Sequence, residues 1–396
     1  MLWILAVAQL LSSIGFSMIF PFLPNYVGEL GAVSGISIVF WTGAVFSAQA
    51  VTMAIASPLW GAVADRFGRK PMLVRAMLGA AIVVTLMGFV TNAEQLVLLR
   101  AIQGIVAGTV SAGNALVASL APRNRTGYAM SLLQTANWGG VALGPLMGGI
   151  LADEYGYALS FVITGALLFI GGLLVVFGVK EKFVPVEASK RQSILGGWKH
   201  LMAKRGMATT FVARFTSSLG RGLLVPIMPL FVPLIMASTQ GVSTFTGLVI
   251  GVSSATGTVS SLLLGSLGDR TGHKRILIVS GILSALSYLA MAFVTNSWQL
   301  LLLNAISGFA TGGLMPALSA LIAAYADEDE IGSAFGLDNS VMSAARAASP
   351  LVAVGFASMF DYHAVFVVGA LIFLATVVLS WLRLPDSNPK PDVVIR

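Results

Sequence analysis

Long apolar runs alternate with short polar breaks along the whole chain. Each run is close to the roughly 20 residues that one helix needs to cross a bilayer. The breaks leave no stretch long enough for a sizeable aqueous domain. The pattern therefore predicts an all-α membrane protein of twelve transmembrane helices, with spans at 3-27, 36-60, 72-91, 95-119, 127-151, 158-179, 207-236, 243-266, 276-295, 299-324, 332-357 and 362-382.

Four segments of the first half return in the second half at an offset of 204 or 205 residues. They run from Pro21 to Pro24, from Gly61 to Lys70 and from Gln95 to Gly104, and over the pair at 144 and 145. Four matches at nearly one offset indicate an internal repeat. Because six expected spans separate the copies, both halves cross the membrane in the same orientation. We expect two pseudo-symmetric six-helix bundles at 1-179 and 207-383, a cytoplasmic linker at 180-206 and a cytoplasmic tail at 384-396.

Composition supports a lipid-embedded chain and excludes several other classes. The chain is 57% hydrophobic and 10% charged, whereas soluble domains have about 25% charged residues. Its net charge of +7 comes from basic residues at the ends of apolar runs, so we expect no nucleic-acid partner. With no Cys and three His that are not spaced as a ligand pair, we expect no disulfide, metal or cofactor.

The basic residues also predict the topology. Of the 23 Lys and Arg, Arg100, Arg214, Arg221 and Arg346 fall inside expected spans, and the other nineteen lie on one face, in loops, at the start of the span 72-91 or in the tail. By the positive-inside rule this face is cytoplasmic, and both termini lie there. Arg214 is one to two turns from the end of its span, so we expect its side chain to reach the interface. The first apolar run starts at Met1 without a basic region or a cleavage site, which indicates a retained helix.

The repeated polar loop carries a recognisable motif. Its first copy contains Gly61, Asp65, Arg66, Gly68 and Arg69, and its second copy contains Gly265, Asp269, Arg270 and Gly272. The first copy resembles the signature loop of the major facilitator superfamily, and this resemblance covers the whole chain. It implies a cytoplasmic lock in which Asp65 accepts hydrogen bonds from helix N-terminal amides and from Arg. The alternative is that the basic residues of the loop act only as topology signals.

A glycine-rich run in the fifth span is similar to a second family motif. Gly140, Gly144, Pro145 and Gly148 match the pattern of the drug:proton antiporter branch of that superfamily, and Pro350 is the counterpart of Pro145 in the repeat. Glycines four residues apart allow a neighbouring helix to approach closely, and proline permits a bend. The segments 20–24, 56–61 and 114–118 further resemble a multidrug efflux subgroup of this branch. The resemblance implies export of drugs.

Polar residues inside the spans are candidates for a central cavity, because burying them in lipid is unfavourable. In the span 95-119, Arg100, Gln103 and Asn114 lie within a narrow arc of a helix, and the resemblance assigns Arg100 a role in proton coupling or cavity organisation. Arg221 lies near the middle of its own span. Asp338 is the only acidic residue inside an expected span, and it is a candidate proton site unless it reaches the interface.

A second polar stripe lies in the span 332-357. Asn339, Ser343 and Arg346 follow each other at helical spacing, and the repeat maps the first two onto Gln134 and Trp138. We expect these groups to face one axis. Because Arg100, Arg221 and Arg346 outnumber Asp338, the cavity is expected to favour anionic or zwitterionic amphiphiles. The alternative is that backbone carbonyls, helix dipoles or lipid phosphates neutralise these arginines.

We therefore expect a monomeric secondary transporter in a bacterial inner membrane that exports amphiphilic drugs or lipid-like molecules in exchange for protons. An uptake or exchange transporter for an anionic metabolite is the first alternative, because a fold does not define a substrate. A membrane enzyme is the second alternative, but the sequence contains no nucleophile with a base and no metal constellation. A channel is less compatible with paired halves, and an ATP-driven pump would need a GxxxxGK[ST] loop, which is absent.

Overall fold

The computed structural model describes residues 1–120, 126–181, 201–236, 238, 240–327 and 330–385. Every regular element in these ranges is a helix. In the first half the helices are α1 (Leu2–Met18), α2 (Leu23–Leu30), α3 (Ile38–Phe67), α4 (Arg69–Met87), α5 (Ala93–Val106), α6 (Thr109–Leu120) and α7 (Thr126–Gly178). In the second half they are α9 (Met207–Ile235), α10 (Val242–Thr271), α11 (His273–Met291), α12 (Ser297–Tyr325), α13 (Ile331–Met359) and α14 (Tyr362–Arg383). Most of the expected linker and tail lies outside the described residues.

The described helices provide the twelve expected spans. Ten helices or joined helices are individually long and apolar enough to cross a membrane, and α1 and α2 form one further span with a bend of 47°. The break between the two helices lies at residues 19–22 and contains Pro21, and Pro24 follows in the first turn of α2, so the chain lacks two backbone donors here. Helix α7 has 53 residues, too many for one crossing, and reverses at Gly156, where φ is +81°. It therefore crosses twice, and the fold is that of an all-α membrane protein.

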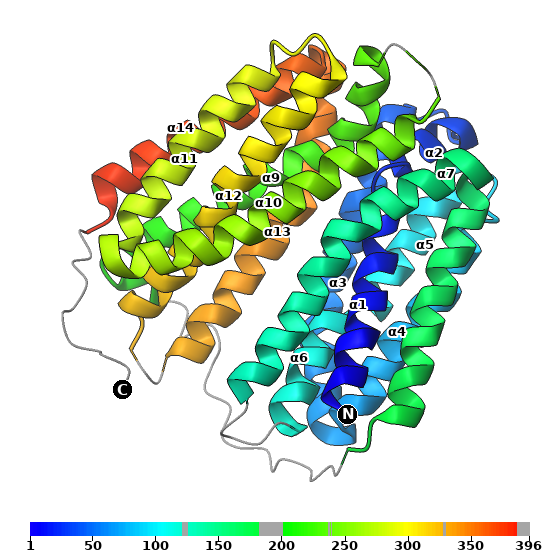
Figure 1. Cartoon of the computed structure of the whole chain (residues 1–396), viewed down its shortest axis with the longest axis horizontal. Helices are drawn as coiled ribbons and strands as arrows, with labels where there is room; N and C mark the ends of the chain where they lie inside the picture. The colour runs from blue at the N-terminus through cyan, green and yellow to red at the C-terminus, as the bar shows by residue number, and fades with distance from the viewer. Residues whose placement is uncertain (121–125, 182–200, 237, 239, 328–329, 386–396) are drawn as a thin grey trace.

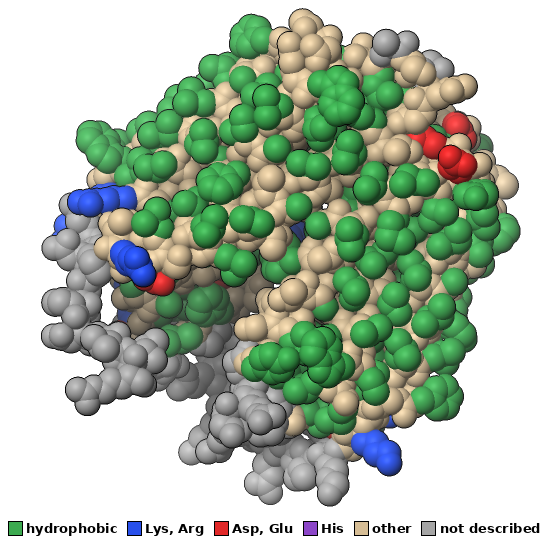
Figure 2. Space-filling model, viewed as in Figure 1, with side chains coloured by type: hydrophobic (Ala, Val, Ile, Leu, Met, Phe, Trp, Pro, Cys, Tyr) green, Lys and Arg blue, Asp and Glu red, His purple; other side chains and the backbone are tan. Residues whose placement is uncertain are grey.

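The helices form two bundles, α1–α7 and α9–α14 (Figure 1). Met1 and the end of α14 at Arg383 lie toward the same side of the molecule, which we call the terminal face; the side with the turn at Gly156 is the opposite face. Figure 2 shows the Lys and Arg side chains of this view at the margins of the terminal face, with one acidic side chain beside them, and a group of Asp and Glu side chains near the opposite face. Which face is cytoplasmic stays a prediction.

The repeat seen in the sequence extends to individual helix contacts. The hydroxyl of Thr52 in α3 donates to the carbonyl oxygen of Ala101 in α5 over 2.8 Å. At the equivalent place in the second half, the hydroxyl of Thr256 in α10 donates to the carbonyl oxygen of Ala305 in α12 over 2.9 Å. Each donor and each acceptor is 204 residues from its counterpart, so the two bundles share their packing as well as their sequence motifs.

Helix starts are repeated in the same way. The side chain of Asn92 accepts from the N–H of Gln95 at the start of α5, and Asn296 accepts from the N–H of Gln299 at the start of α12, both over 2.9 Å. In each case the Gln side chain accepts from the backbone of the residue before the Asn. These reciprocal bonds satisfy N–H groups that a helix start leaves unpaired.

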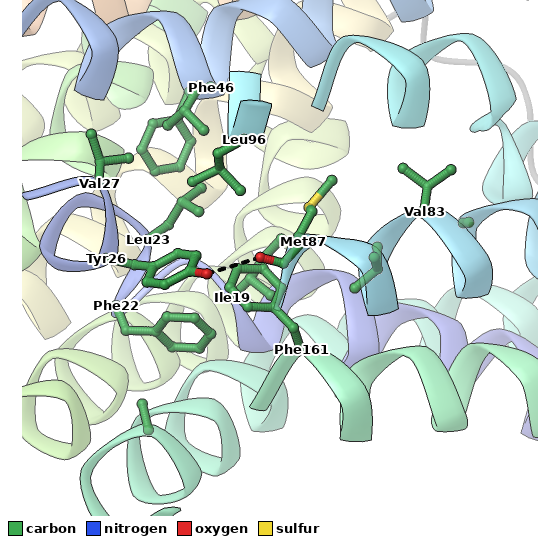
Figure 3. Close-up of a cluster of buried hydrophobic side chains, with 14 of the residues drawn as sticks. Ile19, Phe22, Leu23, Tyr26, Val27, Phe46, Val83, Met87, Leu96 and Phe161 are labelled. Atoms are coloured by element: carbon green, nitrogen blue, oxygen red, sulfur yellow. Dashed lines mark hydrogen bonds between the residues drawn. The ribbon is translucent and has the colours of Figure 1, made fainter. Parts of the chain in front are cut away.

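An aromatic cluster holds the first bundle together near the opposite face (Figure 3). The rings of Phe22, the N-cap of α2, and Phe161 in α7 meet edge to face with centroids 5.4 Å apart. The hydroxyl of Tyr26 donates to the carbonyl oxygen of Met87 at the end of α4 over 3.0 Å. Contacts of this kind add to the stabilisation from apolar burial. The bent end of the first span is thereby fixed to α4 and α7.

Candidate functional site

The two bundles approach each other most closely near the opposite face, where α7 packs against α10. A Cβ placed on Gly247 would lie 2.7 Å from the carbonyl carbon of Pro145, and one on Gly149 would lie 2.6 Å from that of Ser243. Farther toward the centre, a Cβ on Gly251 would lie 2.7 Å from the carbonyl oxygen of Ala142. Only glycine permits such backbone contact. We call this contact the α7–α10 seal.

A carboxylate reinforces the seal at its outer end. Asp153 of α7 accepts hydrogen bonds from the N–H groups of Ser243 and Thr244, over 3.1 and 2.7 Å. Both donors belong to the first turn of α10, whose N–H groups have no partner within the helix and whose dipole favours a negative charge. A second contact between the bundles lies at Gly43 of α3, where a Cβ would be 3.4 Å from the carbonyl oxygen of Pro350 in α13.

On the terminal side of these contacts the two bundles diverge (Figure 1), and the surface is hollowed between them (Figure 2); we call this hollow the recess. In α7, Trp138 continues the helix face that carries Ala142, Pro145 and Gly149, and 44% of its side chain is exposed. Gln134, one turn before Trp138, is also exposed. Because these side chains lie on the face that meets α10 in the seal, they point into the recess.

The facing wall comes from α13. Asn339 and Arg346 are exposed and Ser343 is partly exposed, although all three lie within a candidate membrane span. Arg346 is one turn before Pro350, which contacts the other bundle. The structure thus brings the expected pseudo-equivalent pairs, Gln134 with Asn339 and Trp138 with Ser343, to the same recess from opposite bundles. Their function as a binding site stays a prediction.

Arg221 joins Arg346 at this recess. Arg221 lies in α9 and is partly exposed, while its neighbour Gly222 packs against α13, so that a Cβ there would be 2.6 Å from the Cβ of Ser349. Because Gly222 meets Ser349, Arg221 and Arg346 lie one and three residues from the same contact between α9 and α13. Among the described residues, neither has a hydrogen-bond or ion-pair partner. Within the described part of the chain they are two positive charges without a counter-charge.

Arg214, by contrast, forms a buried ion pair, and the expectation that it reaches the interface is wrong. Its Nε lies 2.7 Å from the Oδ1 atom of Asp338, and the side chains are 1% and 7% exposed. The guanidinium also donates to Ser319 Oγ over 2.6 Å and to the carbonyl oxygen of Met315 over 3.3 Å. This pair links α9, α12 and α13. Asp338 therefore does not lie at the interface and does not offset the charges in the recess.

Arg100 and Gln103 lie away from the recess. Both are buried between α5 and α3, where Arg100 Nε donates to the carbonyl oxygen of Val45 over 3.0 Å and Nη1 donates to Gln103 Oε1 over 2.8 Å. The backbone carbonyl and the amide solvate the guanidinium, which is the alternative that the sequence left open for the arginines. We infer that Arg100 fixes α5 to α3.

The polar arc that includes Arg100 also ends sooner than expected. Between α5 and α6 the chain leaves the helical conformation, and Gly108 has a φ of +119°. The indole Nε1 of Trp60 donates to the carbonyl oxygen of Ile105 over 2.7 Å, and Arg75 lies over the Trp60 ring with its Cζ 3.4 Å from the centroid. Asn114, in α6, is partly buried and is not in helical register with Arg100. Apart from the glycine itself, no residue pattern indicated this break.

The first signature loop makes its described contacts within its own bundle. Gly68 has a φ of +100°, a conformation that favours glycine, between α3 and α4. Arg69 Nη1 donates to the carbonyl oxygen of Ala115 over 2.9 Å, and the carboxylate of Glu181 accepts from the N–H groups of Arg69 and Lys70. Arg66 is exposed. Gly61 and the side chain of Asp65 lie outside what the structure describes.

The second signature loop is similar. Gly272 has a φ of +94° between α10 and α11, and Arg270 is exposed. Asp269 lies 3.3 Å from His273 Nε2, and Lys274 donates to the carbonyl oxygen of Leu384 over 2.7 Å. Gly265 is in ordinary contact with α12. The contacts that the structure describes for both loops lie within their own bundle.

The glycine-rich run of α7 serves two interfaces. Cβ atoms on Gly140, Gly144 and Gly148 would lie 2.8, 2.6 and 2.5 Å from backbone atoms of α1. Gly149, the next residue, instead faces α10 in the seal. The motif therefore fixes α7 to α1 inside the bundle, and one residue of the run contributes to contact between the bundles.

One groove is not part of this site. It has a volume of about 380 Å³ and lies between α1 and the second half of α7, where Ile4, Phe177 and other apolar side chains line it. Its almost wholly apolar lining suits lipid chains. In the described residues, His, Asp and Glu form no group that could hold a metal ion.

Comparisons with known proteins identify a family model and relatives that match this chain. The family model of the Major Facilitator Superfamily matches residues 5–213 and again residues 210–395. The multidrug resistance protein MdtG of Salmonella heidelberg (strain SL476) is 37% identical over 371 residues, covering 94% of this chain and 92% of that protein. MdtG of Salmonella arizonae has the same identity and coverage. The resemblance to a multidrug efflux subgroup is confirmed.

A solved structure shows the same fold at low identity. A bacterial homologue of the human lysosomal transporter Spinster, in an inward-facing and occupied conformation, superimposes with a TM-score of 0.82 at 14% identity, covering 96% of both chains.

Proposed function

Because this chain belongs to the Major Facilitator Superfamily, we propose that it exports amphiphilic small molecules across a bacterial inner membrane by alternating access, in exchange for protons. Membership makes it a multi-pass membrane transporter, and relatives named for multidrug resistance support a drug as the substrate. The observation that carries the proposal is a recess between two repeated bundles that is open on the terminal face and sealed by the α7–α10 contact on the other.

Charge supports an orientation with the terminal face in the cytoplasm. Nineteen of the 23 Lys and Arg lie in segments that the topology places on this face. Basic loops are retained on the cytoplasmic side during insertion. In this orientation the recess takes substrate from the cytoplasm or the inner leaflet, and rocking of the bundles would break the seal and form the lock at the signature loops. The protein would act as a monomer, because each chain contains both bundles.

The buried pair of Arg214 and Asp338 supports proton coupling. Asp338 is the only acidic residue within the expected spans, and its carboxylate bridges α13 to α9. Protonation would remove its charge and release Arg214 to other partners. A carboxyl whose charge changes a contact between helices can couple proton binding to conformational change. We therefore assign Asp338 to the coupling step and not to the substrate surface.

Inverted membrane vesicles test the direction and the energy source together, because their outer surface is the cytoplasmic one. We expect a fluorescent amphiphile to accumulate in vesicles that contain the protein when the lumen is acidified. A protonophore should release it. Accumulation only in right-side-out vesicles would instead support an uptake transporter, and accumulation that ignores the protonophore would remove proton coupling.

A further inference from the structure

We propose that Arg221 and Arg346 form a site for a single anionic group, a carboxylate, sulfate or phosphate, on the amphiphile that enters the recess. This inference rests on the proposed function, since it names the chemistry of the substrate. It also differs from the expectation from sequence, in which Arg100 contributed a third positive charge to the cavity beside Arg221 and Arg346. The structure places Arg100 in helix packing and leaves two arginines at the recess.

The two arginines are held together by the scaffold that carries them. Helices α9 and α13 are joined by the ion pair of Arg214 with Asp338, and farther toward the membrane centre by the close contact of Gly222 with Ser349. At the terminal face, just before these two helices begin, Lys204 donates hydrogen bonds to Asp327 and Glu330, which raise the pKa of its ammonium group. Three links along two helices prevent the arginines from separating. A preorganised pair loses little freedom on binding a ligand.

The charge balance of the recess favours an anion. Arg221 and Arg346 carry the same charge beside one contact between α9 and α13, and among the described residues no carboxylate pairs with either, since Asp338 is already paired with Arg214. Guanidinium groups present several N–H donors in a plane and match the oxygens of carboxylates and phosphates. An anion between them would convert repulsion into two charge-assisted contacts. A cation would be repelled by both groups.

The opposite wall provides for the apolar part of such a ligand. Trp138 is 44% exposed and presents an aromatic ring from the other bundle, across the recess. An amphiphile with its anionic head at the arginine pair and its apolar part toward Trp138 would contact both bundles. The ligand would therefore sense their relative position, which is required of a transported substrate.

The test measures binding at equilibrium to the full-length protein in lipid nanodiscs. The probes share one chain length and differ in charge: laurate, dodecylamine and lauramide. We expect the wild type to bind laurate most tightly. Arg346→Gln and Arg221→Gln should each weaken laurate binding about ten- to a hundredfold, as for a lost charged hydrogen bond, and change lauramide binding less than about twofold. Arg346→Lys, which keeps the charge, should retain part of the affinity.

Arg383→Gln is the matched control, because it removes a basic residue that is exposed at the end of α14, away from the recess. Thermal unfolding of each variant checks that it is folded. The proposal is overturned if laurate binding is unchanged in both glutamine variants, or if dodecylamine binds the wild type better than laurate. This result is independent of the vesicle assay, so transport without anion binding would refute only this inference.

A second arm identifies where the anion comes from. Nanodiscs of phosphatidylcholine are compared with nanodiscs that contain phosphatidylglycerol. If the anionic lipid competes with laurate in the wild type and not in Arg346→Gln, the site takes a lipid head group. If it does not compete, the site takes a free amphiphile. Both results support an anion site.

Discussion

The α7–α10 seal makes a sharp prediction about Gly247, because a methyl group there has no space in the conformation described here. A Cβ would lie 2.7 Å from the carbonyl carbon of Pro145 and 3.0 Å from the Cα of Leu146, whereas ordinary contacts of a Cβ begin at 3.4 Å. Both neighbours are backbone atoms, so no side chain can rotate away. Gly247→Ala should therefore push the two bundles apart at the opposite face.

The expected size follows from known effects of overpacking. Inserting a methyl group into a closely packed contact costs about 1–3 kcal/mol. If rocking of the bundles opens the seal, the methyl group is not overpacked in the conformation that is open at the opposite face, and that conformation is not destabilised. The equilibrium should then shift toward the conformation open at the opposite face by about 5- to 150-fold, which is the same free energy expressed as a population ratio.

Distance measurements between two spin labels can detect this shift. The chain has no Cys, so cysteines introduced at Phe89 and Phe293 would be the only labelled positions. These residues are 68% and 75% exposed, belong to different bundles and are equivalent in the repeat. We expect a longer distance component to increase in Gly247→Ala relative to the parent with the two labels.

Two other glycines provide the controls. Gly355→Ala in α13 should change nothing, because no atom lies within 4 Å of its Cβ position. Gly148→Ala contacts α1 within the same bundle, so it should lower the unfolding temperature without a longer distance component. If Gly247→Ala behaves like Gly148→Ala, the seal does not open in the transport cycle; if it behaves like Gly355→Ala, the close approach is not present in the membrane.

Three further changes test other parts of the mechanism. Asp338→Asn leaves Arg214 buried without a counter-charge and should destabilise the protein by about 3–5 kcal/mol. The double variant Asp338→Asn with Arg214→Gln should recover much of the lost unfolding temperature, but its transport in vesicles should no longer respond to a pH gradient. Asp153→Ala removes both hydrogen bonds to the start of α10, so spin labels should report a shift in the direction of Gly247→Ala but smaller; an unchanged distribution would show that the carboxylate adds nothing to the seal. Asp65→Asn should nearly abolish transport at unchanged expression, and Asp269→Asn should have a milder effect; wild-type transport by Asp65→Asn would remove its gating role.

The span pattern and the bundle arrangement could be predicted because they depend on properties that repeat along the chain. Apolar length indicates each crossing, and an offset of 204 residues relates one half to the other. The same offset relates contacts that the sequence did not suggest, such as those of Thr52 and Thr256 with the carbonyl oxygens of α5 and α12. The two halves therefore repeat contacts between helices as well as sequence motifs.

The break between α5 and α6 could not be predicted from periodicity. A run of apolar residues continues through Ala107 and Gly108, and hydropathy does not distinguish a helical glycine from one with a φ of +119°. The carbonyl groups near the break are contacted by Trp60 and Arg75, which belong to other helices. A polar arc drawn at 100° per residue holds only while the helix continues.

The roles of the embedded arginines depend on contacts that sequence position does not encode. In the sequence, Arg100, Arg214, Arg221 and Arg346 are all basic residues within apolar spans. Arg100 donates to the backbone carbonyl group of Val45. Every residue has a backbone carbonyl group, so this acceptor cannot be recognised from the residue types in the sequence. Arg214 is satisfied by a carboxylate 124 residues away. Only a three-dimensional structure separates these two from the pair without partners among the described residues, and it is this difference that assigns the anion to Arg221 and Arg346.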